Sequence, residues 1–146
     1  MSAGYSGRPL VQKLGIKEGY ALALLNAPDG YDGLLGRLPD GVTVARELKG
    51  QFDLIQLFST GRADLEREFT KSKAGLKQGG AIWVSWPKAS SGLQTDLSDA
   101  VVREVGLKNG LVDVKVCAVD DSWSALKFVR RLKDRDDNSR RSDRKA

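Results

Sequence analysis

The chain has 146 residues, a length that fits one domain of ordinary size. It contains no histidine and one cysteine, which excludes Ser-His-Asp and Cys-His catalysis, a zinc site of Cys and His ligands, and an intrachain disulfide. The net charge of +5 includes a surplus of two from residues 133–146, which hold six basic and four acidic residues. Because that segment has almost no apolar side chain to bury, we expect a folded domain over residues 5–132 and a disordered charged tail over 133–146.

The longest apolar run, residues 20–25, is far shorter than the roughly 20 residues that a membrane-spanning helix needs. The first residues also lack the apolar core of a signal peptide, so we expect a cytoplasmic protein with no membrane contact. The expected partner is a small molecule or another protein. Nucleic acid is expected at most at the tail, where interleaved aspartates weaken the attraction of the arginines for phosphate.

The first elements along the chain alternate between helix and strand. Residues 8–14 are expected to form a short helix that Gly15 ends. The continuous apolar run at 20–25 indicates a strand buried on both faces. A break follows, and then a short helix or turn at 31–38 and a second strand at 41–45 are expected.

The middle of the chain repeats this alternation. A third apolar strand is expected at 52–58 and a fourth at 81–86. Between them, the spacing of apolar residues predicts a helix over 62–74. Ser59 or Thr60 is the expected cap of that helix, because both hydroxyls can accept from its first N–H groups.

The last third of the chain ends differently. Thr95 is the expected cap of another helix, and Gly106 is its expected end. Residues 111–117 and 123–130 flank a tight turn, and the alternating valines of the first run indicate an antiparallel hairpin. The whole order predicts an α/β fold, a doubly wound, mostly parallel sheet between two helical layers that is closed by an antiparallel C-terminal hairpin.

Two short strings resemble the class I methyltransferase-like branch of the Rossmann folds: residues 52–55 resemble the entry into its central strand, and 76–84 resemble the lead into the next strand. A second resemblance is to an uncharacterised bacterial family, a domain of unknown function. The strings that carry it are residues 4–7, 25–31, 84–88, 110–120 and 122–130. This resemblance covers residues 4–131 and implies the methyltransferase-like fold, with no established activity attached to it.

The loop after the first strand departs from the glycine-rich turn of adenosylmethionine and dinucleotide enzymes. It reads Asn26-Ala-Pro-Asp-Gly30, in which Ala27 adds a Cβ and Pro28 removes an N–H donor. Gly30 and Glu47 are the residues that would contact adenosylmethionine, with Glu47 placed for the ribose hydroxyls. We therefore expect no cofactor, with S-adenosylmethionine as the alternative.

In a doubly wound sheet, ligands bind beyond the carboxyl ends of the strands. The side chains predicted there offer hydrogen-bonding, stacking and cationic groups; they are Asn26, Asp29, Tyr31, Thr60, Arg62, Trp86 and Lys88. Ordinary turn chemistry explains the same residues, so both interpretations stay open. No catalytic residue is predicted, because Ser85 and Lys88 flank Pro87 on extended backbone and not on one helical turn. No metal site is predicted either, since the oxygen ligands are too few.

These observations predict a non-catalytic module that binds a small ligand or another protein on a degenerate methyltransferase-like fold. The alternative is an enzyme that uses the same cleft, namely an S-adenosylmethionine-dependent methyltransferase with an atypical cofactor loop. Methyl transfer proceeds largely by positioning two reactants, so the lack of histidine leaves this alternative open.

Overall fold

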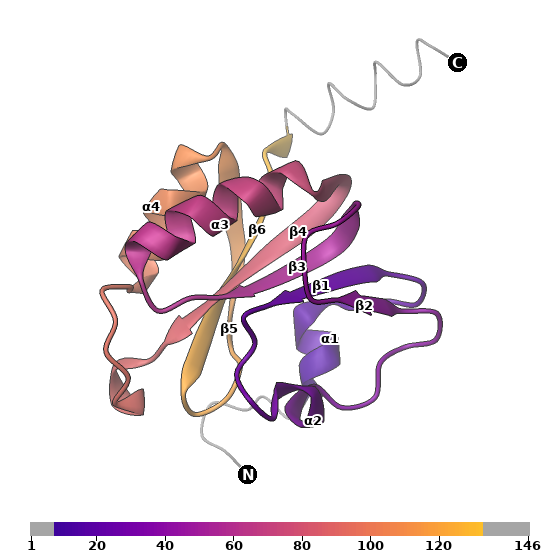
Figure 1. Ribbon diagram of the computed structural model, residues 1–146, viewed down its shortest axis with the longest axis horizontal. Coiled ribbons are helices and arrows are strands. Elements are labelled where there is room, and N and C mark those ends of the chain that lie inside the picture. The colour runs from indigo at the N-terminus through magenta and orange to yellow at the C-terminus, as the bar shows by residue number, and fades with distance from the viewer. Residues whose placement is uncertain (1–7, 133–146) are drawn as a thin grey trace.

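The structure is a computed structural model that describes residues 8–132. Its elements in chain order (Figure 1) are α1 (Leu10–Leu14), β1 (Ala21–Leu25), α2 (Tyr31–Leu35), β2 (Thr43–Ala45), β3 (Phe52–Phe58), α3 (Arg62–Ala74), β4 (Leu76–Pro87), the short 3-10 helix η1 (Ala89–Ser91), α4 (Asp99–Lys108), β5 (Leu111–Ala118) and β6 (Trp123–Arg130). The predicted tail at 133–146 lies outside the described residues. Over residues 8–132, no helix combines the length and apolar character needed to cross a bilayer.

One six-stranded sheet has the order β2-β1-β3-β4-β6-β5. The strands β2, β1, β3 and β4 run parallel, and β6 pairs antiparallel with both β4 and β5. This arrangement confirms the predicted doubly wound sheet with its closing hairpin. The strand order reverses between β1 and β3, because β2 lies outside β1 on one side and β4 lies beyond β3 on the other.

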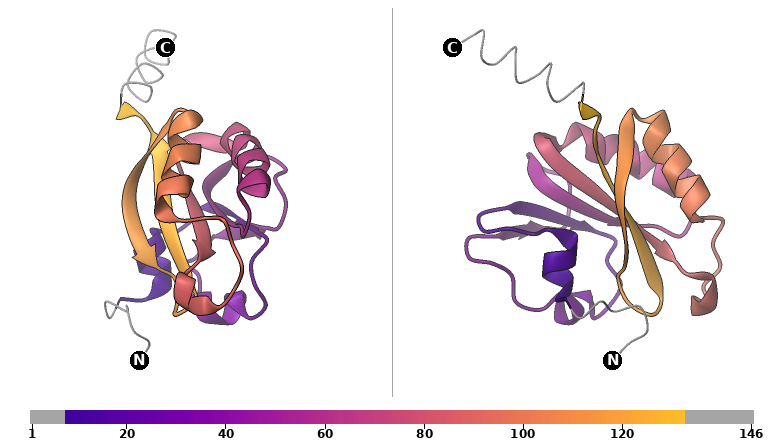
Figure 2. Two further views of the ribbon diagram at one scale, coloured as in Figure 1. Left: turned by 90° about the vertical axis from the view of Figure 1, so that its left-hand side faces the viewer. Right: turned by 180° about the vertical axis from the view of Figure 1, so that it is seen from behind.

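The helices α3 and α4 cover one face of the sheet, and α1 and α2 lie on the other (Figures 1 and 2). Under α3 and α4, Phe69 and Phe128 meet edge to face, with ring centroids 5.4 Å apart. Gly106 was the expected end of α4, but the helix continues to Lys108. Gly106 is instead a close-packing position, since a Cβ there would lie 2.1 Å from the Phe128 ring.

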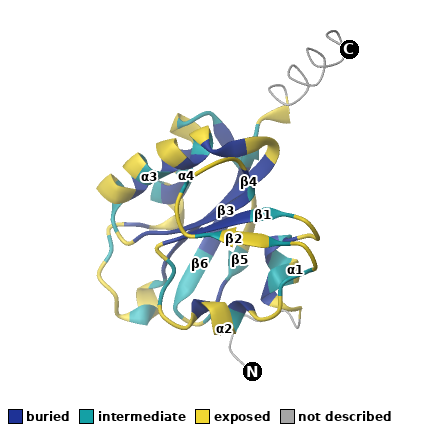
Figure 3. Cartoon of the chain, turned by 45° about the vertical axis from the view of Figure 1, so that its right-hand side comes forward, coloured by how far each residue is buried: buried dark blue, intermediate teal, exposed yellow. Residues whose placement is uncertain are grey.

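The opposite face is covered by the short helices α1 and α2 (Figure 3), and buried polar contacts lie beneath them. The Trp83 indole Nε1 donates to the carbonyl oxygen of Leu14, 2.8 Å away, at the end of α1. The Tyr31 hydroxyl donates to Gln56 Oε1 at 2.5 Å, and Gln56 Nε2 donates to Ser85 Oγ at 3.2 Å. All the side chains in these contacts are buried, so the α1 and α2 face has a hydrogen-bonded centre.

Both predicted helix caps are wrong: a segment distant in the chain supports the start of α3, and the adjacent serine caps α4. Gly61 precedes α3 in place of Ser59 or Thr60, and as a glycine it has no side chain that could cap the helix. The backbone N–H of Arg62 donates to Asp96 Oδ1 at 2.8 Å. For α4 the cap is Ser98, whose Oγ accepts from Val101 N, and not Thr95. The loop after β4 therefore supports the start of α3 as well as that of α4.

Candidate functional site

A hollow of about 580 Å³ lies beyond the carboxyl ends of β1 and β3, at the point where the strand order reverses. Its walls come from the ends of these two strands, from α3 and from the start of β6; they are Asn26, Phe58, Ser59, Thr60, Asp64, Arg67, Glu68, Lys71 and Trp123. Open α/β sheets bind ligands at this position, because loops leaving adjacent strands in opposite directions open a crevice between them.

The α3 side of the hollow carries both signs of charge. Asp64, Arg67, Glu68 and Lys71 follow the three- and four-residue spacing that places side chains on one helical face. Arg67 forms an ion pair with Asp64. Asn26 Nδ2, just after β1, donates to Glu68 Oε2 of α3 at 2.7 Å. Both carboxylates thus already have a partner among the lining residues.

The opposite wall of the hollow is aromatic. Phe58 is buried and Trp123 is half-buried, and their rings meet edge to face with centroids 5.2 Å apart. Trp123 reaches this edge because β6 runs antiparallel to β4 and so begins where β4 ends. Asp120 Oδ1 accepts from the backbone N–H groups of Ser122 and Trp123, at 2.8 and 2.9 Å, which holds the hairpin turn in place.

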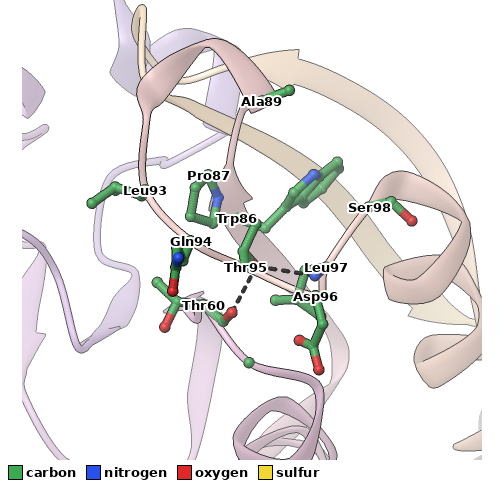
Figure 4. Close-up of a pocket in the computed structure, with 11 residues that line it drawn as sticks. Thr60, Trp86, Pro87, Ala89, Leu93, Gln94, Thr95, Asp96, Leu97 and Ser98 are labelled. Carbon is green, nitrogen blue, oxygen red and sulfur yellow. Dashed lines mark hydrogen bonds between the residues drawn. The ribbon is translucent and has the colours of Figure 1, made fainter.

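A second hollow of about 840 Å³ lies on the other side of the turn between β3 and α3 (Figure 4). Trp86 and Pro87, at the end of β4, form part of its wall, and the exposed Leu93 stands at another side. Thr95 Oγ1 donates to the Thr60 carbonyl oxygen at 2.6 Å, tying the two loops together. Thr60 lines both hollows, so it is the structural link between them.

Three of the predicted ligand-binding residues line these hollows: Asn26 lines the first, Trp86 the second, and Thr60 both. Tyr31 does not, because its hydroxyl is used by Gln56 and its ring is packed 4.8 Å from that of Phe58. Burial raises the pKa of the Tyr31 hydroxyl well above its ordinary value, so the group stays protonated.

Arg62 points to other partners, with ion pairs to Glu66 at 3.4 Å and Glu104 at 3.2 Å. Its hydrogen bond to Glu104 raises the pKa of the guanidinium further. Lys88 is tied to the hairpin, since its backbone N–H donates to the Ser122 carbonyl oxygen at 2.8 Å. Asp29 is exposed on its loop. None of these three residues is among the linings of the two hollows.

The two residues predicted for a cofactor also lie outside both linings. Gly30 caps the start of α2 with a φ of 82°, a left-handed conformation that suits glycine. Glu47 is exposed and lies 3.4 Å from Lys49. Within residues 8–132, no group of three or more His, Cys, Asp and Glu side chains is arranged to hold a metal ion.

In the first hollow, sequence reasoning missed Phe58, Trp123 and four residues of α3. The α3 spacing was visible, but it does not say which face of a helix overhangs a strand end. For Cys117, burial raises the thiol pKa, while Lys13, Lys115 and Lys88 oppose that rise. Lys115 is two residues from Cys117 in the sequence, whereas Lys13 and Lys88 are brought near it only by the folded chain.

No family model and no curated protein matches the chain. Solved structures do match it, at 9 to 13% identity. Magnesium protoporphyrin IX methyltransferase from Synechocystis PCC 6803, with bound SAH, is 12% identical, with a TM-score of 0.55, 84% of this chain covered and 78% of that chain. A SAM-dependent methyltransferase from Aquifex aeolicus is 12% identical, with a TM-score of 0.55 and coverages of 82% and 86%.

A possible exported protein from Bordetella parapertussis is 13% identical, with a TM-score of 0.59 and coverages of 84% and 65%. At these identities the matches show the fold alone. The chain therefore has a class I methyltransferase-like fold. Its likeness to an uncharacterised bacterial family stays a prediction.

Proposed function

We propose that the protein is a binding module for a small polar molecule that carries both charges, held in the hollow at the carboxyl ends of β1 and β3. The observation that carries this proposal is the composition of that hollow. It combines two cations, two carboxylates and three neutral hydrogen-bonding residues with an aromatic wall, at the switch point of the sheet. Sites of this kind orient a ligand through a few polar groups and gain affinity from apolar contact.

Each part of the lining suits one part of such a ligand. Lys71 and Arg67 can pair with a carboxylate or phosphate, and Glu68 with an ammonium group. Thr60 can donate or accept a hydrogen bond. Trp123 offers a flat apolar surface to a planar group. A zwitterion with a planar substituent satisfies all of these contacts together.

The same residues favour binding without catalysis. The chain has no histidine, so the side chain best suited to proton transfer near neutral pH is missing. Both carboxylates in the hollow already accept from neighbouring donors, Asp64 from Arg67 and Glu68 from Asn26. These hydrogen bonds hold the two carboxylates in place as binding groups.

The alternative function, S-adenosylmethionine-dependent methyl transfer, is favoured by the fold, since neighbours were solved with SAH and with SAM. The turn after β1 fits that cofactor incompletely. Pro28 has no N–H, and the N–H of Tyr31 is already donated to the Pro28 carbonyl oxygen at 3.1 Å. Donors that a glycine-rich turn would direct to a ligand are therefore missing or used internally.

Thermal melting of the full chain with a panel of zwitterionic metabolites, including SAM and SAH, tests both functions. A ligand at about 100 times its Kd adds about 2.7 kcal/mol of stability. We expect at least one stabilising compound, whose effect is lost in Lys71→Ala and kept in Lys49→Ala, a lysine outside both hollows. A panel with no stabilising compound, or an effect unchanged in Lys71→Ala, overturns the proposed site.

Methylation assays separate the two functions. Two results together would establish the enzyme. SAM would stabilise the wild type, and the wild type would transfer methyl groups to a cell extract in a reaction that Thr60→Val abolishes. SAM and SAH that leave the melting temperature unchanged set the methyltransferase aside, while another panel member can still support the binding module.

A further inference from the structure

The face of the sheet that carries α1 holds a pair of like charges. Lys115 on β5 and Lys127 on β6 are directly opposed in the antiparallel register. Side chains in such a pair have Cβ atoms about 5 Å apart, and like charges in this position destabilise a sheet. Lys115 on an edge strand has an ordinary explanation, because edge lysines discourage aggregation. Lys127 has no such explanation, since β6 is an interior strand.

Lys127 is held in place by packing. Its ammonium lies 5.9 Å from the centre of the Trp83 ring. In the sheet, Lys127 is paired with Trp83 of β4 on one side and with Lys115 of β5 on the other. Burial lowers the pKa of Lys127, and the nearby Lys115 and Lys17 lower it further. Within the described residues, no ion pair joins Lys17, Lys115 or Lys127 to a carboxylate.

The positive charge continues from this pair toward the carboxyl edge of the sheet. Lys13 Nζ donates to the Ala118 carbonyl oxygen, 2.9 Å away, at the end of β5. Lys13, Lys88 and Lys115 each lie close enough to the Cys117 thiol to lower its pKa. The five lysines 13, 17, 88, 115 and 127 are called the lysine track below.

The lysine track is extended and not concentrated at one point. The backbone of Lys88 is bonded to Ser122, and Lys127 lies five residues further along β6, a separation of about 16 Å in a strand. A single phosphate cannot contact both ends. Nearby acids have other positions or partners: Asp113 pairs with Arg103 of α4, and Glu18 follows Lys17 in the chain without an ion pair in residues 8–132.

We propose that the lysine track binds the sugar-phosphate backbone of single-stranded nucleic acid. A linear polyanion spans the 16 Å separation, and its phosphates relieve the repulsion of the opposed Lys115 and Lys127. Each phosphate neutralised releases condensed counterions, which makes the binding strong at low salt and independent of base sequence. The lysine track shares no residue with the linings of the two hollows. It also differs from the tail, where the sequence placed any nucleic-acid contact.

Fluorescence anisotropy with a labelled oligouridine or oligothymidine of about 12 nucleotides tests this surface on the full chain. The double variant Lys17→Gln/Lys115→Gln is expected to weaken binding about 25-fold at about 0.1 M salt, about fivefold for each lost contact. It should also reduce the slope of log K against log salt by about 1.4. The variant Lys17→Arg/Lys115→Arg keeps the charges and is expected to bind like the wild type.

Two control pairs remove the same charge elsewhere. Lys49→Gln/Lys108→Gln lies outside the track, and Arg140→Gln/Arg141→Gln lies in the tail; both are expected to change Kd by less than about twofold. Equal weakening by all three pairs would mean a net-charge effect and would overturn the proposal, as would a loss confined to the tail pair. A wild type that binds phosphatidylserine vesicles but neither oligonucleotide, or that binds nothing at low salt, also overturns it.

Discussion

The two faces of the sheet are stabilised by different means. Under α3 and α4, helices of 13 and 10 residues bury an apolar layer in which the Phe69 and Phe128 rings pack. The other face has two helices of five residues each, too short to be stable by themselves. There, Trp83 bonds to the end of α1 and Tyr31 to Gln56. Directional hydrogen bonds therefore hold the short helices α1 and α2 in place, whereas the longer helices α3 and α4 are held by the apolar surface that they bury.

Glycine-to-alanine substitutions give the largest expected contrast between the faces. Gly106→Ala places a Cβ 2.1 Å from the Phe128 ring, which is fully buried against Phe69, so we expect a loss of about 3 kcal/mol. Gly33→Ala in α2 has nothing within 4 Å and no positive φ, so we expect a gain of about 0.5–1 kcal/mol. Urea unfolding measures both.

A double-mutant cycle assigns the Gly106 effect to the ring. In a Phe128→Leu background, Gly106→Ala should lose much less stability than in the wild type, because the obstructing aromatic carbons are gone. Additive effects of the two substitutions would show that α4 tolerates a Cβ at this position and that the close packing is not limiting.

Trp83 and Trp86 lie on β4 and face opposite sides of the sheet. Tryptophan-to-phenylalanine substitutions at these positions therefore compare the two faces with the same change in side-chain volume. Trp83→Phe leaves the Leu14 carbonyl oxygen without its partner and opens a void, so we expect a loss of about 3 kcal/mol. Trp86→Phe, on the α3 and α4 face of β4, removes no hydrogen bond seen among residues 8–132, and we expect about 1.5 kcal/mol. Guanidinium unfolding compares them, and equal losses would contradict the role of the indole N–H.

Tyr31→Phe tests the hydrogen-bonded centre of the second face. We expect a loss of about 1–2 kcal/mol below pH 9, because Gln56 loses a donor in a buried site. The pKa of Tyr31 is raised in the folded state, so above about pH 10 the unfolded chain ionises first and wild-type stability falls as pH rises. The advantage over Tyr31→Phe should shrink by about 1.4 kcal/mol by about pH 11.

Urea unfolding at both pH values measures this difference, with Tyr20→Phe as the control on a half-buried tyrosine. An advantage of the wild type that stays constant from pH 9 to pH 11 would show that the Tyr31 hydroxyl titrates normally in the fold.

The strands were predictable because burial on both faces demands continuous apolar runs. The runs at 20–25 and 52–58 correspond to β1 and β3 within one residue. Gly106 was misread because its local signal, a glycine late in a helix, is the same for a helix end and for close packing. Only the Phe128 ring, 22 positions away in the chain, separates the two. β4 begins earlier than expected and passes through Gly80, where a Cβ would lie 2.8 Å from the Asp53 carbonyl oxygen.

The candidate site was predictable only where it depends on strand ends. Asn26, Thr60 and Trp86 follow or end strands, and topology alone brings them to one edge. Tyr31 also follows β1 in the sequence, but its side chain turns into the core. It does so because Gln56, in the middle of β3, lies beneath it and accepts its hydrogen bond. A polar residue such as Gln56 within an apolar strand indicates that a buried hydrogen-bond partner exists, but it does not identify that partner.

Helix capping gives the smallest expected contrast, and it separates α4 from the other helices. Ser98 Oγ accepts from Val101 N at the start of α4, whereas α1, α2 and α3 begin without a side-chain cap. We expect Ser98→Ala to lower stability by about 1 kcal/mol, measured by urea unfolding. Ser98→Asp should retain most of that stability, because a carboxylate can accept the same N–H and interacts favourably with the helix dipole. Ser98→Asp as unstable as Ser98→Ala would show that the loop from Thr95 onward, and not the cap, positions α4.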